Sequence, residues 1–149
     1  MTSAHVAGLA AYHFVLGCVA TCGFALWFNV PRDIVARTCL FGGGAYLVRF
    51  VLIHLGESPA AAAFWASLFV GLAGYAQARS ARVPRVLLTV PAVIPLVPGI
   101  AAYDTIVSFF RGDPLAGLGS AVKATIIVVA LAGGLIAARV VTLTSRPPP

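Results

Sequence analysis

Charged residues are scarce in this sequence. Only 9% of its 149 residues are Asp, Glu, Lys or Arg, whereas 60% are apolar. A soluble domain is usually about one quarter charged, so this chain has too few polar groups to cover a surface that faces water. The composition therefore excludes an ordinary soluble domain and indicates that lipid is the solvent. The length predicts a single domain over residues 1–149.

Acidic residues are the rarest charged type, with four Asp or Glu against ten Lys or Arg, which gives a net charge of +6. A basic balance can indicate nucleic-acid binding. Here, however, the basic residues are scattered singly between apolar runs and form no patch with interleaved aromatic residues. We therefore expect membrane lipid around the chain and no nucleic-acid partner.

Cysteine is also scarce, and Cys18, Cys22 and Cys39 all fall in apolar helical runs. Small packing residues are the favoured interpretation. No third or fourth ligand lies near Cys18 and Cys22, so we expect no metal site. The sequence also lacks a Ser-His pair, a paired-Asp arrangement or a His-Glu-x-x-His motif. These absences predict that the chain is not an enzyme and holds no cofactor.

The sequence instead contains long runs without charged residues. Residues 2–31, 58–78 and 86–103 contain no Lys, Arg, Asp or Glu, and a helix needs about 20 apolar residues to cross a bilayer. Two further runs are interrupted only by Arg49 with His54, and by Lys123. The pattern predicts an all-α integral membrane protein of about five transmembrane helices. The predicted spans are residues 6–28, 38–55, 59–78, 86–110 and 114–138, with a short turn at 32–37 and a disordered tail at 140–149.

The basic residues also predict an orientation. If the N-terminus lies outside, only Arg111 and Lys123 fall on the outer side, and Arg49 falls within the membrane. Seven arginines then fall on the cytoplasmic side: Arg32, Arg37, Arg79, Arg82, Arg85, Arg139 and Arg146. Short cytoplasmic loops are enriched in Lys and Arg, so we predict an N-out, C-in topology.

Small residues and caps predict how the helices begin and pack. Gly42, Gly43 and Gly44 are interpreted as a tight helix contact or a flexible point, since the run lacks the Lys and Ser or Thr of a nucleotide loop. In the third span, a stripe of small residues predicts packing within the chain: Ala63, Ser67, Gly71 and Gly74. Ser58-Pro59 and Asp113-Pro114 are each predicted to be an N-cap followed by a first-turn proline.

The fourth span carries Pro91, Pro95, Pro98 and Gly99 within nine residues. Each interior proline removes one helical hydrogen bond, and an unsatisfied backbone group at membrane depth must find a partner in protein, water or ligand. One proline would favour a simple kink, but three with a glycine favour a discontinuous helix, which in transporters lines a cavity. The carbonyls expected to lose their helical donors are those of Leu87, Pro91 and Ile94.

Ionisable residues inside a membrane are costly and often functional. Arg49 and Asp104 both fall towards the predicted outer side, and because opposite charges lower each other's burial cost we expect them to be neighbours. A substrate site and a structural ion pair are equally favoured for Arg49. Lys123 is interpreted as reaching the membrane interface. His13 and Asp104 are candidates for a proton relay, the alternative for His13 being a simple hydrogen bond to a neighbour.

Two segments resemble the small subunit of the threonine/serine exporter family. The first is Phe-Ala-Leu-Trp-Phe-Asn-Val-Pro at residues 24–31, followed by the glycine-rich second span and Arg49. The more specific one is Pro-Ala-Val-Ile-Pro-Leu-Val-Pro-Gly-Ile-Ala-Ala-Tyr at residues 91–103. The similarity extends over nearly the whole chain. Asp104 departs from the family pattern, in which a hydroxyl or basic residue occupies that position.

The resemblance implies secondary export of small polar metabolites, either threonine- and serine-like amino acids or small dicarboxylates. It also implies a larger partner subunit that forms the other half of the transporter, and a location in the bacterial cytoplasmic (inner) membrane. The expected substrate path follows the helix break and its polar neighbours: Arg49, Pro91, Pro95, Pro98, Gly99, Tyr103 and Asp104. Tyr103 is alternatively an aromatic residue of the membrane interface.

A non-transporting assembly subunit is the alternative function, and it predicts that Arg49 and Asp104 tolerate apolar replacement. The predicted topology bears on the choice between the two, because two structurally related halves with an odd number of spans each would form inverted repeats, which are common in transporters.

Overall fold

The computed structural model describes residues 3–144, and every element in this part of the chain is helical. The helices are α1 (Ser3–Trp27), α2 (Arg32–His54), α3 (Pro59–Ala81), α4 (Val86–Val93), the 3-10 helix η1 (Ile94–Leu96), α5 (Gly99–Phe110) and α6 (Pro114–Thr144). The last five residues of the predicted tail, 145–149, lie outside the described residues.

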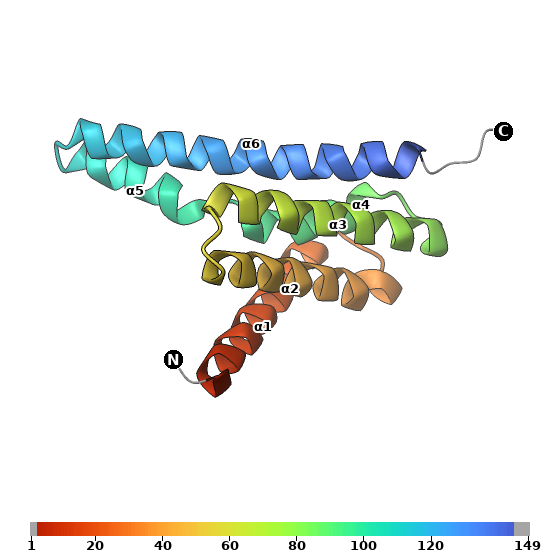
Figure 1. The fold of residues 1–149 in the computed structure, drawn as a ribbon. Helices are drawn as coiled ribbons and strands as arrows, with labels where there is room; N and C mark the ends of the chain where they lie inside the picture. Colours follow the sequence, from red (N-terminus) through yellow and green to blue (C-terminus); the bar gives the residue numbers. More distant parts are fainter. Residues whose placement is uncertain (1–2, 145–149) are drawn as a thin grey trace.

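Four of these helices are long and apolar enough to cross a membrane: α1, α2, α3 and α6. A fifth span is available if α4 with η1 and α5 count as one helix, bent by 46°. In Figure 1 this pair runs from the end of the bundle where α3 finishes to the opposite end, where α6 begins. The prediction of an all-α membrane protein is confirmed, and the proline-rich span is the bent one.

Helix α2 begins earlier than the sequence predicted. Arg32 to Arg37 form its first turns, whereas we expected a connecting turn before residue 38. The amides of Ile34 and Val35 both donate to the carbonyl of Pro31, and Asp33 lies in the first turn, where a negative charge suits the helix dipole. The prediction was wrong because charged residues end only the lipid-embedded part of a helix, and α2 continues beyond that part.

Helix α6 continues past its predicted end. We expected it to stop by Arg139, but it runs to Thr144, so residues 140–144 of the predicted tail are helical. Val140 and Val141 keep the apolar pattern, and no helix-breaking residue occurs before the prolines at the C-terminus. With 31 residues α6 is about 46 Å long, which exceeds the roughly 30 Å hydrocarbon core of a bilayer.

Both predicted caps are present. The Ser58 hydroxyl accepts a hydrogen bond from the Ala61 amide at 3.1 Å, with Pro59 in the first turn of α3. The Asp113 carboxylate accepts one from the Ala116 amide at 3.0 Å at the start of α6. Each cap satisfies an amide that has no acceptor within its own helix.

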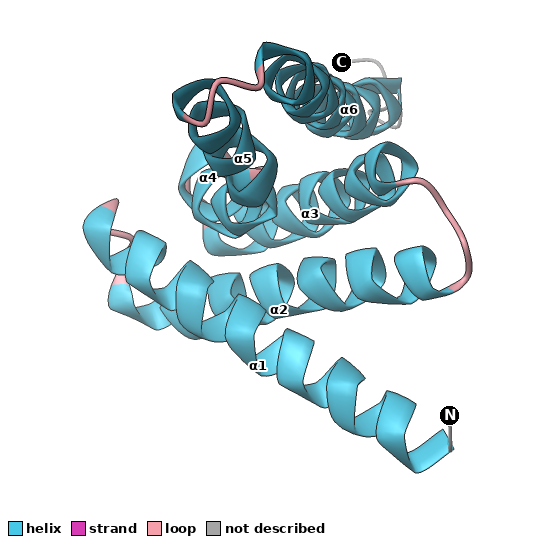
Figure 2. Ribbon diagram, turned by 90° about the vertical axis from the view of Figure 1, so that its left-hand side faces the viewer, coloured by secondary structure: helices cyan, strands magenta, loops and turns pink. Residues whose placement is uncertain are grey.

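The helices pack in successive layers, with α1 on the outer side of α2 and α6 beyond α3, while α4 lies beside α3 and α5 packs against α6 (Figure 2). At the α1–α2 contact a Cβ on Gly42 would collide with Thr21, and one on Gly43 would collide with Cys18 and lie 2.8 Å from the Phe14 carbonyl oxygen. The interpretation of this glycine run as a tight helix contact is confirmed.

Small residues also bring α3 close to α4 and α6. A Cβ on Gly71 would meet Ala138, one on Gly74 would meet Thr89, and one on Gly134 would meet Ser67. The predicted stripe of α3 therefore packs within the chain. The central apolar core contains residues of α2, α3, α4, η1 and α6: Ala45, Ala63, Ala66, Val70, Ala92, Leu96, Ile127 and Leu131.

Candidate functional site

The helix break is built in three steps along the chain. Pro91 lies inside α4, Pro95 lies in the 3-10 turn η1, and Val97 is then extended with φ −58° and ψ 137°. Pro98 precedes α5 and occupies the N-cap position. One of the carbonyls predicted to lose its helical donor has another one, because the Ile94 carbonyl accepts a hydrogen bond from the Val97 amide at 3.1 Å. The prediction for Ile94 was wrong because the chain tightens to a 3-10 turn there, which replaces the missing donor.

Arg49 of α2 contacts this break. Its Nη1 donates to the Leu96 carbonyl oxygen at 3.4 Å. In a continuous helix that oxygen would accept the amide of Ile100, but the extended Val97 carries the chain away. The Nε of Arg49 is buried and has no partner among the described residues. The Arg49 side chain therefore bonds to a backbone carbonyl at the helix break, while its buried Nε makes no hydrogen bond.

A cavity of about 370 Å³ lies between Arg49 and the start of α5. Its volume falls within the range of small-molecule sites. Helix α2 contributes two of its lining residues, α6 contributes another two, and the rest come from the break and from α5. The lining residues are Tyr46, Arg49, Val97, Pro98, Gly99, Ile100, Ala101, Asp104, Lys123 and Ile127.

Two amides in the first turn of α5 lack a backbone acceptor in the described part of the chain. The Gly99 amide donates to Val97 at 2.8 Å and the Ala102 amide to Pro98 at 3.1 Å, but the amides of Ile100 and Ala101 have no backbone acceptor in the described part of the chain. Free amides and the positive end of the helix dipole favour an anion at this position. Because Ile100 and Ala101 line the cavity, the break offers it two backbone donors.

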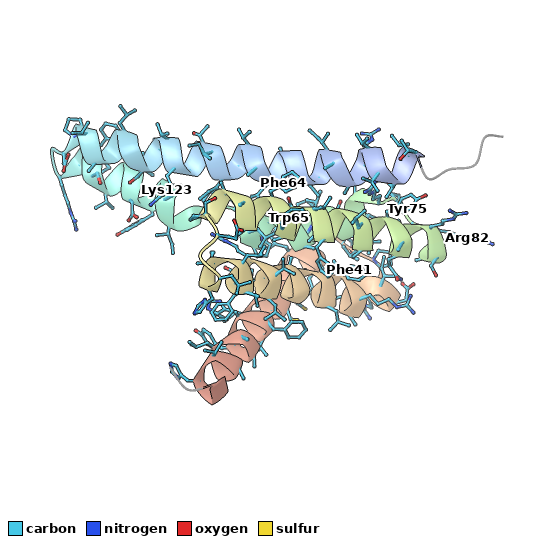
Figure 3. The ribbon with its side chains drawn as sticks, in the orientation of Figure 1. Phe41, Phe64, Trp65, Tyr75, Arg82 and Lys123 are labelled. Carbon is cyan, nitrogen blue, oxygen red and sulfur yellow. The ribbon has the colours of Figure 1, made fainter. Side chains whose placement is uncertain are left out.

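Three charged side chains line the same cavity: Arg49 from α2, Asp104 from α5 and Lys123 from α6. Arg49 and Asp104 were expected to be neighbours, and both do lie on this cavity, although no ion pair joins them among residues 3–144. Lys123 lies beside α5 in Figure 3. The cavity thus presents positive and negative groups that are not neutralised by direct contact.

Of the seven residues expected on the substrate path, the structure brings four to this cavity: Arg49, Pro98, Gly99 and Asp104. Pro91 is buried within α4, and neither it nor Pro95 lines the cavity. Tyr103 does not line it either and is 66% exposed. Successive residues of a helix point about 100° apart, so Tyr103 faces away when Asp104 faces the cavity.

His13, the candidate for a proton relay, lies in an aromatic group. Its ring stacks on Phe50 at 4.4 Å and lies 6.2 Å from Tyr46, between ring centroids. Tyr46 in turn lines the cavity. No interaction joins His13 directly to Asp104 within the described residues, so the relay stays a prediction.

Lys123 and Tyr46 are cavity residues that the sequence interpretation missed. Lys123 was expected to reach the membrane interface, and this stays a prediction, because its side chain is exposed as well as lining the cavity. Helical spacing could have placed Lys123 on this side of α6, because Lys123, Ile127 and Leu131 recur every four residues, and the last two belong to the buried face of α6. A cation on that stripe points towards the other helices.

A second and larger cavity, of about 970 Å³, lies at the other end of the bundle, where α3 ends, α4 begins and α6 ends. Arg85 is its central side chain: Nη2 donates to the Gly71 carbonyl at 2.7 Å and Nη1 to the Thr142 hydroxyl at 3.3 Å. Its guanidinium also lies 5.5 Å from the centroid of the Tyr75 ring. Burial lowers the pKa of Arg85, and the positive charge of Arg139 lowers it further.

Comparison with known families adds one match. The family described as "Threonine/Serine exporter, ThrE" matches residues 13–141 of this chain, a range that includes every residue lining the two cavities except Thr142 and Leu143. No solved structure matches the chain.

Proposed function

The chain belongs to the threonine/serine exporter family, and we propose that it exports zwitterionic amino acids through the cavity at the break between η1 and α5. Membership supports a role in membrane transport and places the chain in a family of transporters, not of enzymes. The observation that carries the proposal is the pairing, on one cavity at the helix break, of cationic donors with one carboxylate.

Each charge of an amino acid has a complement in this cavity. The carboxylate suits the free amides of Ile100 and Ala101 together with the positive charge of Arg49. The ammonium group suits the Asp104 carboxylate, one turn further along α5. Serine and threonine are short enough to place both groups within one cavity of this size.

Small dicarboxylates are a second candidate substrate, favoured by one observation. Lys123 adds a second cation opposite Arg49 and could complement a second carboxylate. Asp104 would repel that group, since like charges at close range in a medium of low dielectric constant are unfavourable. Asp104 therefore decides between the two classes, and it favours the amino acid.

We propose further that the chain forms half of the transporter and that a larger subunit supplies the other half. Gly99 and Asp104 are exposed in the isolated chain. At membrane depth lipid cannot solvate the free amides and the carboxylate on this side of the cavity. A second subunit or water held by it would supply those contacts. We place the assembly in the bacterial inner membrane.

Export assays on Arg49→Gln and Asp104→Asn, made with the larger subunit in vesicles, test the substrate site. Loss of a charged hydrogen bond costs about 1.5–3 kcal/mol, so we expect roughly tenfold to hundredfold weaker apparent affinity for threonine or serine. Asp104→Asn should spare dicarboxylate transport or improve it. Glu57→Gln, in the exposed loop between α2 and α3, is the matched control and should export normally.

The same assay distinguishes transport from assembly. In a purely structural subunit, Arg49→Leu and Asp104→Leu would assemble and support normal export. That result would overturn the proposed site.

A further inference from the structure

The cavity at the arginine-rich end has no place in the proposed substrate site. It lies at the opposite end of the bundle, as the separation of Tyr75 from Lys123 in Figure 3 shows. Three arginines line it: Arg79 from α3, Arg85 before α4 and Arg139 from α6. No acidic residue is among its lining residues. It is a cationic cavity with no counter-ion among the described residues.

Arg85 is held in this cavity by neutral groups only. Its bonds to the Gly71 carbonyl and the Thr142 hydroxyl, together with its position over Tyr75, connect α3, α4 and α6. These partners satisfy donors but do not balance the positive charge. Arg139 lies close enough to act on Arg85 electrostatically. An anion between them would relieve a repulsion that no described residue compensates.

Apart from Tyr75, Thr89 and Thr142, the rest of the lining is apolar. Val83, Val86, Leu135 and Leu143 surround the arginines. At about 970 Å³ the cavity is more than twice the volume of the one at the helix break, which is about 370 Å³. A small polar metabolite would leave this apolar surface unfilled. A ligand with an anionic head and hydrocarbon beside it matches both parts of the lining.

The cavity also lies at the ends of three helices, where membrane-spanning helices reach the lipid headgroups. It is formed where α3 ends at Ala81, α4 begins at Val86 and α6 ends at Thr144. Basic cavities between transmembrane helices at this depth suit the headgroups of anionic phospholipids. Arginine is also well matched to phosphate, because its planar guanidinium can donate two parallel hydrogen bonds.

We propose that this cavity binds an anionic phospholipid, with its phosphate among Arg79, Arg85 and Arg139 and its hydrocarbon along Val86 and Leu135. The bound lipid would bridge α3, α4 and α6 and hold the first half of the broken span against its neighbours. This site is separate from the proposed substrate site, so either proposal can fail without the other.

Lipid retention by the purified full chain tests the proposal. Native mass spectrometry after exchange into equal amounts of phosphatidylglycerol and phosphatidylcholine should show preferential retention of phosphatidylglycerol. Each arginine near a membrane surface contributes about 1 kcal/mol to anionic lipid binding, so Arg79→Gln and Arg139→Gln should each lower this preference about fivefold. Both side chains are exposed and make no hydrogen bond in the described structure, so both variants should fold.

The matched control removes the same charge outside the cavity. Arg32→Gln and Arg37→Gln lie on exposed turns at the start of α2 and should leave the preference unchanged. An equal loss in the control variants would show that only overall charge matters and would overturn the site.

Two further measurements identify the source of the anion. Glycerol 3-phosphate and inorganic phosphate should not raise the melting temperature, whereas phosphatidylglycerol should. Equal stabilisation by the soluble phosphates would overturn the assignment to a lipid. If the retained lipid were lost on assembly with the larger subunit, acidic side chains of that subunit would be the occupants of the cavity. That result would equally overturn the proposed lipid site.

Discussion

At the scale of single residues, the contact between α1 and α2 depends on the absence of two side chains. Gly42 and Gly43 are buried, and a Cβ at either position would occupy space that Thr21, Cys18 and the Phe14 carbonyl already fill. Close approach of this kind provides most of the attraction between helices in lipid, where the hydrophobic effect no longer distinguishes one apolar surface from another. The glycines thus set the distance between the two helices.

Gly43→Ala should therefore destabilise the protein. The added methyl meets backbone at Phe14 as well as a side chain, so the helices must move apart, and overpacking typically costs about 1–3 kcal/mol. The measurement is the melting temperature of the purified chain in detergent. Gly119→Ala is the control, since nothing lies within 4 Å of that Cβ, and it should be neutral or slightly stabilising. Equal melting temperatures for the two variants would contradict the packing argument.

At the scale of elements, the prolines of the broken span shape the proposed substrate cavity. Pro95 forces the 3-10 turn and Pro98 occupies the N-cap position before α5, and the amides freed by this arrangement line the cavity. The carbonyl of Leu96 is bonded by Arg49. The break is therefore stabilised partly from α2, by a side chain that lies on the same cavity.

Replacing Pro95 and Pro98 together by alanine should allow the span to close its hydrogen bonds. The Leu96 carbonyl would regain its helical donor, the amides of Ile100 and Ala101 would gain acceptors, and the cavity would narrow. We expect normal membrane insertion with export lowered at least tenfold, measured in cells that carry both subunits. Pro84→Ala, at an exposed position before α4, should export normally. Full export by the double variant would mean that the break is only a packing kink.

Much of this organisation was predictable from the sequence, for identifiable reasons. Charge-free runs located the spans because lipid excludes charge, and the prolines located the break because they lack an amide hydrogen. The start of α2 and the end of α6 were missed because arginines end the lipid-embedded segment without ending the helix. The cavity around Arg85 was also missed, since its residues come from α3, α4 and α6, and only packing brings them together.

At the scale of the whole molecule, the two cavities are separated by the central apolar core. Along α6, Ile127 lines the cavity at the break, Leu131 is buried in the core one turn later, and Leu135 lines the arginine-rich cavity after another turn. The start of α1 and the end of α6 lie at opposite ends of the bundle (Figure 1). This agrees with an odd number of spans, while the N-out, C-in orientation stays a prediction.

Because the break is exposed on one side, we expect the chain to need its larger partner to transport. Helix α5 has no buried residue and packs mainly against α6, so Asp104 and the free amides are open on one side. We expect the chain to co-purify with the co-expressed larger subunit in mild detergent. Vesicles that contain this chain alone should export no threonine, whereas vesicles with both subunits should. Because an uncompensated carboxylate at membrane depth is costly, Asp104→Leu should raise the melting temperature of the isolated chain while abolishing export by the assembled pair. Export by the chain alone would show that its own helices complete the path.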